Sequence, residues 1–213
     1  MAPIFYHNPY SQHSRKVRML QSELGFALEL KSVDVRPRGF GGENEQPEFL
    51  RLNPNGKVPV LQDGDLVLWE SNAIACYLAE KNGWSELWPQ DVGQRAEIAK
   101  WQFWQVAHFS PVVDGLMWEH MKSMLGKGEA DVDAVARHQE GLQRWAAVLN
   151  GQLEGKDYLV LDRFTLADIA VSSALTHKES SKIDFAAYPY LQKWYDLVIQ
   201  RPSWKSTALP PMG

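Results

Sequence analysis

Two short stretches in the first third of the chain carry residues that could bind a small peptide with charged ends. The stretches read NPNGKVPVL at 53–61 and ESNAIACYLAEK at 70–81. In the first, Pro59 follows a turn and lacks the N–H that a sheet ladder uses, so it is tolerated only at the start or edge of a strand. The Val58–Pro59 bond can be cis at a cost of about 1 kcal/mol. The backbone groups of Val58 are then free to meet an extended peptide.

Glu70 and Ser71 stand at the start of a predicted helix. The apolar period of the second stretch predicts a helix over 71–82. Unpaired N–H groups and the positive end of the helix dipole attract a carboxylate at such a start. A strand-edge peptide site beside an anion site suits a small anionic peptide. Each stretch by itself is equally well explained by a hairpin start or a capped helix, and only their combination favours peptide binding.

The elements that must position these residues follow from periodicity and from glycine and proline breakers. Strands are predicted at 2–6, 28–34, 58–62 and 65–69, and helices at 12–24, 47–52 and 71–82. The Asp63-Gly64 pair favours a tight hairpin between the last two strands. This order of elements is that of a thioredoxin-like domain, which we expect over residues 1–82.

The rest of the chain shows no convincing strand. Beyond a linker that carries Pro89, helices are predicted at 91–125, 131–154, 165–180 and 188–200. We therefore expect an all-helical domain over residues 90–213, in which Pro111 kinks the first long helix. Thr165 and Asp168, in the run FTLAD, have the spacing of a helix capping box, which is a structural role.

The composition excludes several classes of function. Of the 213 residues, 45% are hydrophobic and 23% are charged, and no stretch approaches the roughly 18 apolar residues of a membrane span. A single cysteine, Cys76, forbids an intramolecular disulfide or a CxxC site. The net charge of −4 with scattered Lys and Arg offers no stripe for nucleic acid, and the six histidines lack metal-ligand spacing. We expect a cytoplasmic protein that binds no membrane, nucleic acid or metal.

The two opening stretches, at their spacing, resemble the cytosolic glutathione S-transferases. In that family the residue before a cis-proline pairs its backbone with the cysteinyl part of glutathione, and a Glu-Ser or Asp-Ser pair holds the γ-glutamyl end. The resemblance implies that Val58, Glu70 and Ser71 bind glutathione as co-substrate. It extends to FTLAD and implies the family fold, α/β plus all-α: a thioredoxin-like domain followed by a helical domain.

The resemblance also implies a group that lowers the pKa of the glutathione thiol, which lies near 8.5 for a free thiol. A hydroxyl at a helix N-terminus does so by donating a hydrogen bond to the thiolate. Ser11, in NPYSQHSRKVR, matches the serine of the plant-type (phi) and theta-like branches and is the predicted catalytic residue. Ser14 could share this role or cap the helix, and we group it with the glutathione-binding residues. Tyr6 is the rival because other branches use a tyrosine there, and His13 is interpreted as a solvated residue.

The remaining contacts are less specified. Lys57 is predicted to pair with the glycyl carboxylate, although a solvated turn lysine explains it equally well. The plant-type branch carries His-Lys where this chain has Asn44 and Glu45, so we expect the loop 35–46 to supply other contacts. By analogy with the family, the pocket for the electrophile is expected between the domains. Its predicted lining residues are Tyr10, Trp104, His108 and Met117.

Together these features predict a glutathione transferase that joins the glutathione thiolate to a small apolar electrophile. Within the family, a glutathione-dependent isomerase or peroxidase is the alternative. From another class, the alternative is a non-catalytic binding or scaffold module, since this fold is reused where the chemistry is lost. A two-fold symmetric homodimer is expected because relatives pair in this way and because the helix at 91–121 carries abundant aromatic residues.

Overall fold

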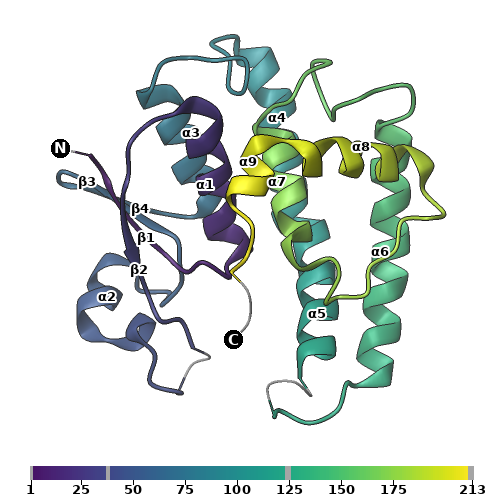
Figure 1. The fold of residues 1–213 in the computed structure, drawn as a ribbon, viewed down its shortest axis with the longest axis horizontal. Coiled ribbons are helices and arrows are strands. Elements are labelled where there is room, and N and C mark those ends of the chain that lie inside the picture. The colour runs from purple at the N-terminus through teal and green to yellow at the C-terminus, as the bar shows by residue number, and fades with distance from the viewer. Residues whose placement is uncertain (1, 37–38, 123–125, 211–213) are drawn as a thin grey trace. The chain divides into compact units, whose positions relative to one another are not determined.

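The computed structural model describes residues 2–36, 39–122 and 126–210, which divide into two units (Figure 1). The first unit contains the residues up to Trp84 together with those from Pro202 onward, and the second contains Ser85–Arg201. The α/β plus all-α class expected from the sequence is confirmed. No helix within the described ranges has the length and apolar character needed to cross a membrane.

The first unit is built on a mixed four-stranded sheet in the order β2-β1-β3-β4. The strands are β1 (Ile4–His7), β2 (Glu29–Ser32), β3 (Val60–Asp63) and β4 (Leu66–Trp69). Strand β1 runs parallel to β2 and antiparallel to β3, which pairs with β4 in the hairpin predicted from Asp63-Gly64. The helices of this unit are α1 (Gln12–Leu24), α2 (Pro47–Leu52) and α3 (Ser71–Lys81), with a 3-10 turn at Glu43–Glu45.

Alternation along β1 assigns the two faces of the sheet. Phe5 and His7 are buried and stack with ring centroids 5.9 Å apart, whereas Tyr6 points to the other face. Tyr6 packs edge to face on Phe49 of α2, with centroids 6.3 Å apart. The face of the sheet with Tyr6 therefore carries a small hydrophobic core of its own. Helices α1 and α3 of the same unit lie side by side (Figure 1).

The C-terminal segment departs from the predicted domain boundary. The short helix α9 (Pro202–Ser206) belongs with the first unit rather than with the domain expected to run to residue 213. The guanidinium of Arg15 on α1 lies 3.7 Å from the ring centroid of Trp204 and donates a 2.9 Å hydrogen bond to its carbonyl. Ser203 also donates to Glu23 at 2.5 Å. These contacts with α1 explain why the end of the chain groups with the sheet domain.

The regular elements of the second unit are helices, as predicted, apart from an isolated β-bridge between Ser85 and Trp88. Its helices are α4 (Val92–Trp104), α5 (Ser110–Met121), α6 (Val132–Gln152), α7 (Leu166–Ala174) and α8 (Pro189–Gln200), with a π-helical turn at Gln105–Phe109 and a 3-10 turn at Leu175–His177. Every residue of α7 is buried, so this helix forms the centre of the unit. The predicted capping box is present: Thr165 caps α7 and the Asp168 carboxylate accepts from the Thr165 backbone N–H at 2.9 Å.

The irregularity predicted at Pro111 takes the form of the π-helical turn. Proline has no N–H to donate to the carbonyl four residues earlier, so the regular ladder is interrupted there. In the turn before it, the Ser110 N–H donates instead to the carbonyl of Gln105, five residues back. The long predicted helix at 91–125 is therefore two helices joined by a widened turn.

A candidate peptide-binding site beside the sheet

Val58 meets the requirements set by the sequence for a peptide-pairing residue. The Val58–Pro59 bond is cis, and β3 begins only at Val60, two residues later than the predicted strand. Within the described part of the chain, the Val58 backbone takes part in no hydrogen bond of the sheet or of a turn. Its N–H and C=O are thus available to an extended ligand.

Glu70 has a conformation that is uncommon for a residue with a side chain. Its φ of 73° and ψ of 110° lie at positive φ, which costs roughly 1–3 kcal/mol for a non-glycine residue. Its side chain is exposed and makes no cap hydrogen bond to α3. A capping role does not account for Glu70, whose carboxylate is available to bind a cation.

Ser71, the first residue of α3, is buried and held by a residue that the sequence analysis missed. The ammonium of Lys16 on α1 donates to Ser71 Oγ at 3.1 Å and to Asn72 Oδ1 at 2.8 Å. Lys16 is itself only 1% exposed. The only hint in the sequence is a lysine next to Val17, inside the apolar face of α1. The start of α3 therefore combines a helix N-terminus with a buried cation, which strengthens its attraction for a carboxylate.

Ser11 and Ser14 have different environments. Ser11 is the N-cap of α1 and is partly exposed, and its Oγ accepts the N–H of Ser14 at 3.2 Å. Ser14 is 2% exposed, and its Oγ accepts the N–H of Asn8 at 3.3 Å. Because Ser11 has its hydroxyl hydrogen free to point to a ligand, it keeps the properties that the predicted thiolate-stabilising residue needs. Ser14 instead braces the loop before α1.

His13 is not the solvated residue expected from the sequence. It is partly buried, and burial together with the charges of Lys16 and Lys57 lowers its pKa from 6.5 to about 4. The imidazole is therefore neutral at neutral pH.

Lys57 borders a cavity of about 800 Å³ together with residues of the loop at 35–46. Arg36, Asn44 and Glu45 also line this cavity. Asn44 is buried and braces this loop: its side chain accepts from the Arg36 N–H at 3.0 Å and donates to the carbonyl of Gly56 at 3.0 Å. Lys57 and Arg36 are exposed cations at this cavity, and Arg36 is already paired with Asp34 at 2.8 Å. Lys57 is therefore the better candidate to hold a carboxylate.

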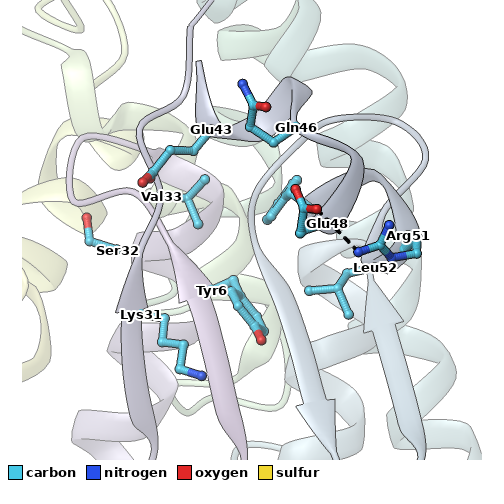
Figure 2. Close-up of a pocket in the computed structure, with 10 residues that line it drawn as sticks. Tyr6, Lys31, Ser32, Val33, Glu43, Gln46, Glu48, Arg51 and Leu52 are labelled. Atoms are coloured by element: carbon cyan, nitrogen blue, oxygen red, sulfur yellow. Dashed lines mark ion pairs between the residues drawn. The ribbon is translucent and has the colours of Figure 1, made fainter. Parts of the chain in front are cut away.

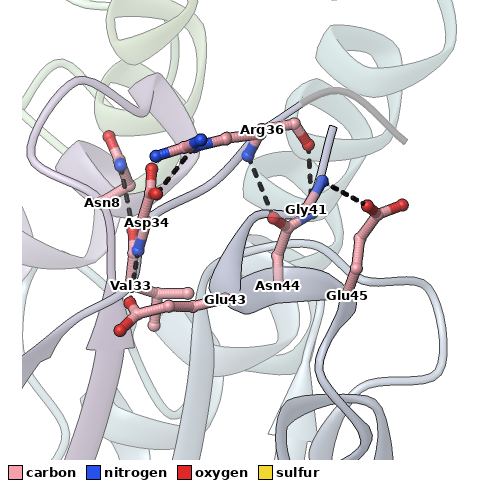
Figure 3. Close-up of polar contacts among 8 residues, drawn as sticks. All are labelled: Asn8, Val33, Asp34, Arg36, Gly41, Glu43, Asn44 and Glu45. Atoms are coloured by element: carbon pink, nitrogen blue, oxygen red, sulfur yellow. Dashed lines mark hydrogen bonds and ion pairs between the residues drawn. The ribbon is translucent and has the colours of Figure 1, made fainter. Parts of the chain in front are cut away.

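Figure 3 shows how the same loop is held by backbone groups and carboxylates. Glu45 accepts the N–H of Gly39 at 2.7 Å and of Gly41 at 3.1 Å, and Glu43 accepts that of Asp34 at 2.7 Å. A Cβ at Gly42 would lie 2.8 Å from the backbone nitrogen of Arg36, so the close approach of the two loop segments requires a glycine at this position. Asn44 and Glu45, which replace the family's His-Lys, thus shape the loop.

Tyr6, the rival to Ser11, faces a different cavity. Figure 2 shows it among residues of β2 and α2 in a cavity of about 660 Å³. Its hydroxyl donates to Gln62 at 3.2 Å and its ring packs on Phe49. None of the predicted glutathione-binding residues lines this cavity. The geometry favours Ser11 over Tyr6.

The predicted electrophile-binding residues are divided between the two units. In the second unit, Trp104 and His108 pack in an aromatic cluster around Trp145, with ring centroids 6.0 and 4.8 Å from it. Trp145, on α6, was not predicted, because helical periodicity does not show which helices face each other. Met117 is partly buried on α5, and Tyr10, in the first unit, is exposed. Their role stays a prediction.

The single cysteine and the metal question complete the list of possible chemistry. Cys76 lies on α3, forms no disulfide and is partly buried. Within the described ranges, no group of three or more His, Cys, Asp or Glu side chains could hold a metal ion.

Comparison with known proteins identifies relatives along nearly the whole chain. The family model described as "Glutathione S-transferase, N-terminal domain" matches residues 1–80, and "Glutathione S-transferase, C-terminal domain" matches residues 110–202. The chain is 34% identical over 221 residues to glutathione S-transferase 3 of Zea mays, which covers 99% of this chain and 97% of that protein.

Two further relatives come from bacteria. Glutathione S-transferase GstB of Escherichia coli K12 is 32% identical over 189 residues, covering 87% of this chain and 89% of that protein. The solved structure of the theta class glutathione S-transferase from Xanthomonas axonopodis pv. citri, with glutathione bound, is 32% identical. It superimposes with a TM-score of 0.86 over 100% of this chain and 99% of that chain.

Proposed function

This chain belongs to the glutathione S-transferase family, and we propose that it joins the thiol of glutathione to a small apolar electrophile, with Ser11 stabilising the thiolate. The observation that carries this assignment is the state of Glu70. Glu70 has an exposed carboxylate and a positive φ, and it precedes a buried serine at a helix N-terminus. The positive φ costs free energy in a residue with a side chain, and a ligand-binding role for the carboxylate accounts for that cost.

The charges of the site match the ends of glutathione. In this proposal the γ-glutamyl ammonium pairs with Glu70, and its carboxylate binds Ser71 and the start of α3, where Lys16 adds a positive charge. The cysteinyl backbone pairs with Val58. The glycyl carboxylate is held by Lys57 in the cavity of about 800 Å³.

The chemistry assigned to Ser11 is stabilisation of a thiolate. Its hydroxyl donates to the sulfur and favours the charged form, so the thiol releases its proton to water at a lower pH. The thiolate then forms a bond to the electrophilic carbon while the leaving group departs with the bonding electrons. Overall, RX and glutathione give the glutathione conjugate and HX.

Retention on glutathione resin followed by a conjugation assay with a generic aryl halide tests this function. A transferase is retained and produces the conjugate at a rate proportional to enzyme concentration. Retention without conjugation would support the scaffold alternative. Conjugation far slower than peroxide reduction or isomerisation would support the alternatives within the family. No retention would contradict the proposed site itself.

We also propose that the active form is a homodimer located in the cytoplasm. The exposed apolar surface of the helical unit supports a dimer, since Phe103 on α4 is 72% exposed. The cytoplasmic location is the usual one in the family and stays a prediction.

A further inference from the structure

The first unit contains a third, smaller cavity, whose described lining residues are all neutral or cationic. It has a volume of about 200 Å³ and lies between the start of α1 and the segment after α9. Two arginines, a histidine and three hydroxyl residues line it: Arg15, Arg18, His7, Ser14, Ser206 and Thr207. Among the described residues that line it, none carries a carboxylate. A cavity of this composition repels cations and favours an anion.

Arg18 lines this cavity and has a polar group for which the described residues supply no partner. Its Nε is buried and has no hydrogen-bond partner, and the guanidinium forms no ion pair within the described ranges. Burial lowers the pKa of Arg18. Arg18 is partly buried, and a guanidinium whose Nε is buried without a partner is destabilised, because a cation that is withdrawn from water needs a hydrogen-bond acceptor and a counter-charge. The missing partner is therefore an acceptor that carries negative charge.

The other groups at the cavity are already engaged and do not supply that partner. Arg15 donates to the carbonyl of Trp204 at 2.9 Å, and Thr207 donates to the carbonyl of Ser203 at 2.6 Å. His7 is buried, and burial and the charge of Arg18 lower its pKa, so it is neutral at neutral pH. The local positive charge is thus that of the two arginines, and the Nε of Arg18 has no acceptor among the described residues.

We propose that this cavity binds a small oxyanion, with Arg18 as its main ligand and the hydroxyls of Ser14 and Thr207 within its wall. The volume fits a phosphate or sulfate ion, or the carboxylate of a small organic acid, and is too small for a whole glutathione molecule. Val58, Glu70 and Ser71, which are proposed to bind glutathione, do not line this cavity. Ser14, which the sequence grouped with the glutathione-binding residues, does line it, but its buried hydroxyl holds the loop before α1. The proposal stands independently of the transferase reaction.

Thermal unfolding at pH 7 and constant ionic strength, with phosphate replacing chloride, tests the proposal. A bound ion raises the Tm in a saturable manner, by about 3–6 °C at ten times its Kd for a chain of this size. Arg18→Gln should abolish this rise. Arg51→Gln is the matched control, because Arg51 is an exposed arginine of the same unit paired with Glu48 at 3.5 Å. It should keep the full response.

A second pair of variants keeps the test informative if Arg18→Gln fails to fold. Ala208 is exposed and lines the cavity, so Ala208→Glu can place a carboxylate beside Arg18, whereas Ala208→Gln offers the same size without the charge. We expect Ala208→Glu to raise the Tm in chloride and to lose the response to phosphate, and Ala208→Gln to keep that response.

Parallel titrations with sulfate and acetate distinguish the sources of the oxyanion. Saturation with phosphate and sulfate alone identifies an inorganic tetrahedral ion, and saturation with acetate as well identifies a carboxylate site. A Tm that rises linearly and equally in the wild type and all variants would reflect exclusion of the salt from the protein surface. That result, or the absence of any response in the wild type, would overturn the proposal.

Discussion

The ammonium of Lys16 on α1 lies 3.1 Å from the hydroxyl of Ser71 at the start of α3, and both side chains are buried. This contact joins two helices whose sequence positions are 55 residues apart. It places a positive charge behind the helix N-terminus that we assign to the γ-glutamyl carboxylate. The charge acts together with the α3 dipole on the same side of the site.

Replacing Lys16 by methionine should therefore weaken glutathione binding. The variant keeps the length of the side chain and removes the charge, and an interaction with a charged group contributes roughly 1.5–3 kcal/mol, which is about ten-fold or more in Kd. Calorimetric titration with glutathione measures the change. Lys100→Met is the control, since Lys100 pairs with Glu97 on the surface of the helical unit. Equal glutathione affinity of the two variants would show that Lys16 does not contribute to the site.

Ser11→Ala should lose most conjugation activity while glutathione affinity stays within a few-fold. The lost hydrogen bond is to the thiolate rather than to the ends of the peptide, so kcat falls and the pH–rate profile moves to higher pH. Ser14→Ala should keep the profile, because the Ser14 hydroxyl is buried against Asn8. Normal activity in Ser11→Ala combined with inactivity of Tyr6→Phe would show that the assignment is wrong.

Glu70 offers a test that separates binding from stability. Glu70→Gly should lose ten-fold or more in glutathione affinity, since the ammonium loses its partner. The same change relieves the positive φ of 73°, so the free energy of unfolding should be higher than that of Glu70→Ala by about 1 kcal/mol. Chemical denaturation and calorimetric titration measure the two quantities. Retention of both variants on glutathione resin at wild-type strength would show that Glu70 is an ordinary surface residue that does not bind glutathione.

The environment of His13 predicts a loss of stability in mild acid. In the unfolded chain His13 binds a proton as the pH falls below 6.5, whereas the folded protein resists protonation down to about 4. Stability contributed by neutral His13 is therefore full above pH 6.5 and lost as the pH falls toward 4. Between about pH 7.5 and about pH 5 we expect a loss of about 1–2 kcal/mol.

Comparison with His13→Asn isolates this contribution. Asp168 titrates in the same range with the opposite sign, because burial raises its pKa to about 6 and ionising it costs stability as the pH rises. The difference in unfolding free energy between wild type and His13→Asn cancels the effect of Asp168. A difference that does not change between the two pH values would contradict the depressed pKa of His13.

Phe103 tests the proposed homodimer. Light scattering at micromolar concentration should report about twice 24.2 kDa for the wild type. Phe103→Glu should lower the mass toward one chain, because a charge on an apolar interface remains desolvated and unpaired. Val132→Glu is the control, since Val132 is 77% exposed at the start of another helix. A wild-type mass of one chain would refute the dimer. A Phe103→Glu variant that remains dimeric would show that the interface does not include Phe103.

The sequence alone determined the features that depend on neighbouring residues. Proline at 59 and the helix start at 70–71 follow from local backbone chemistry, and the capping box at Thr165 and Asp168 follows from a spacing of three residues. The order of strands and helices was predictable for the same reason: side-chain periods of 2 and 3.6 are local properties of the chain.

The tertiary structure decided everything that depends on which surfaces meet. It brought Lys16 to Ser71, buried Ser14 while leaving Ser11 partly exposed, turned Tyr6 to the α2 face, and returned α9 to α1. A lysine in an amphipathic helix is ordinarily solvated, and only packing shows that this one is 1% exposed. Such contacts join residues far apart in sequence, and their energy depends on burial, which no local pattern specifies.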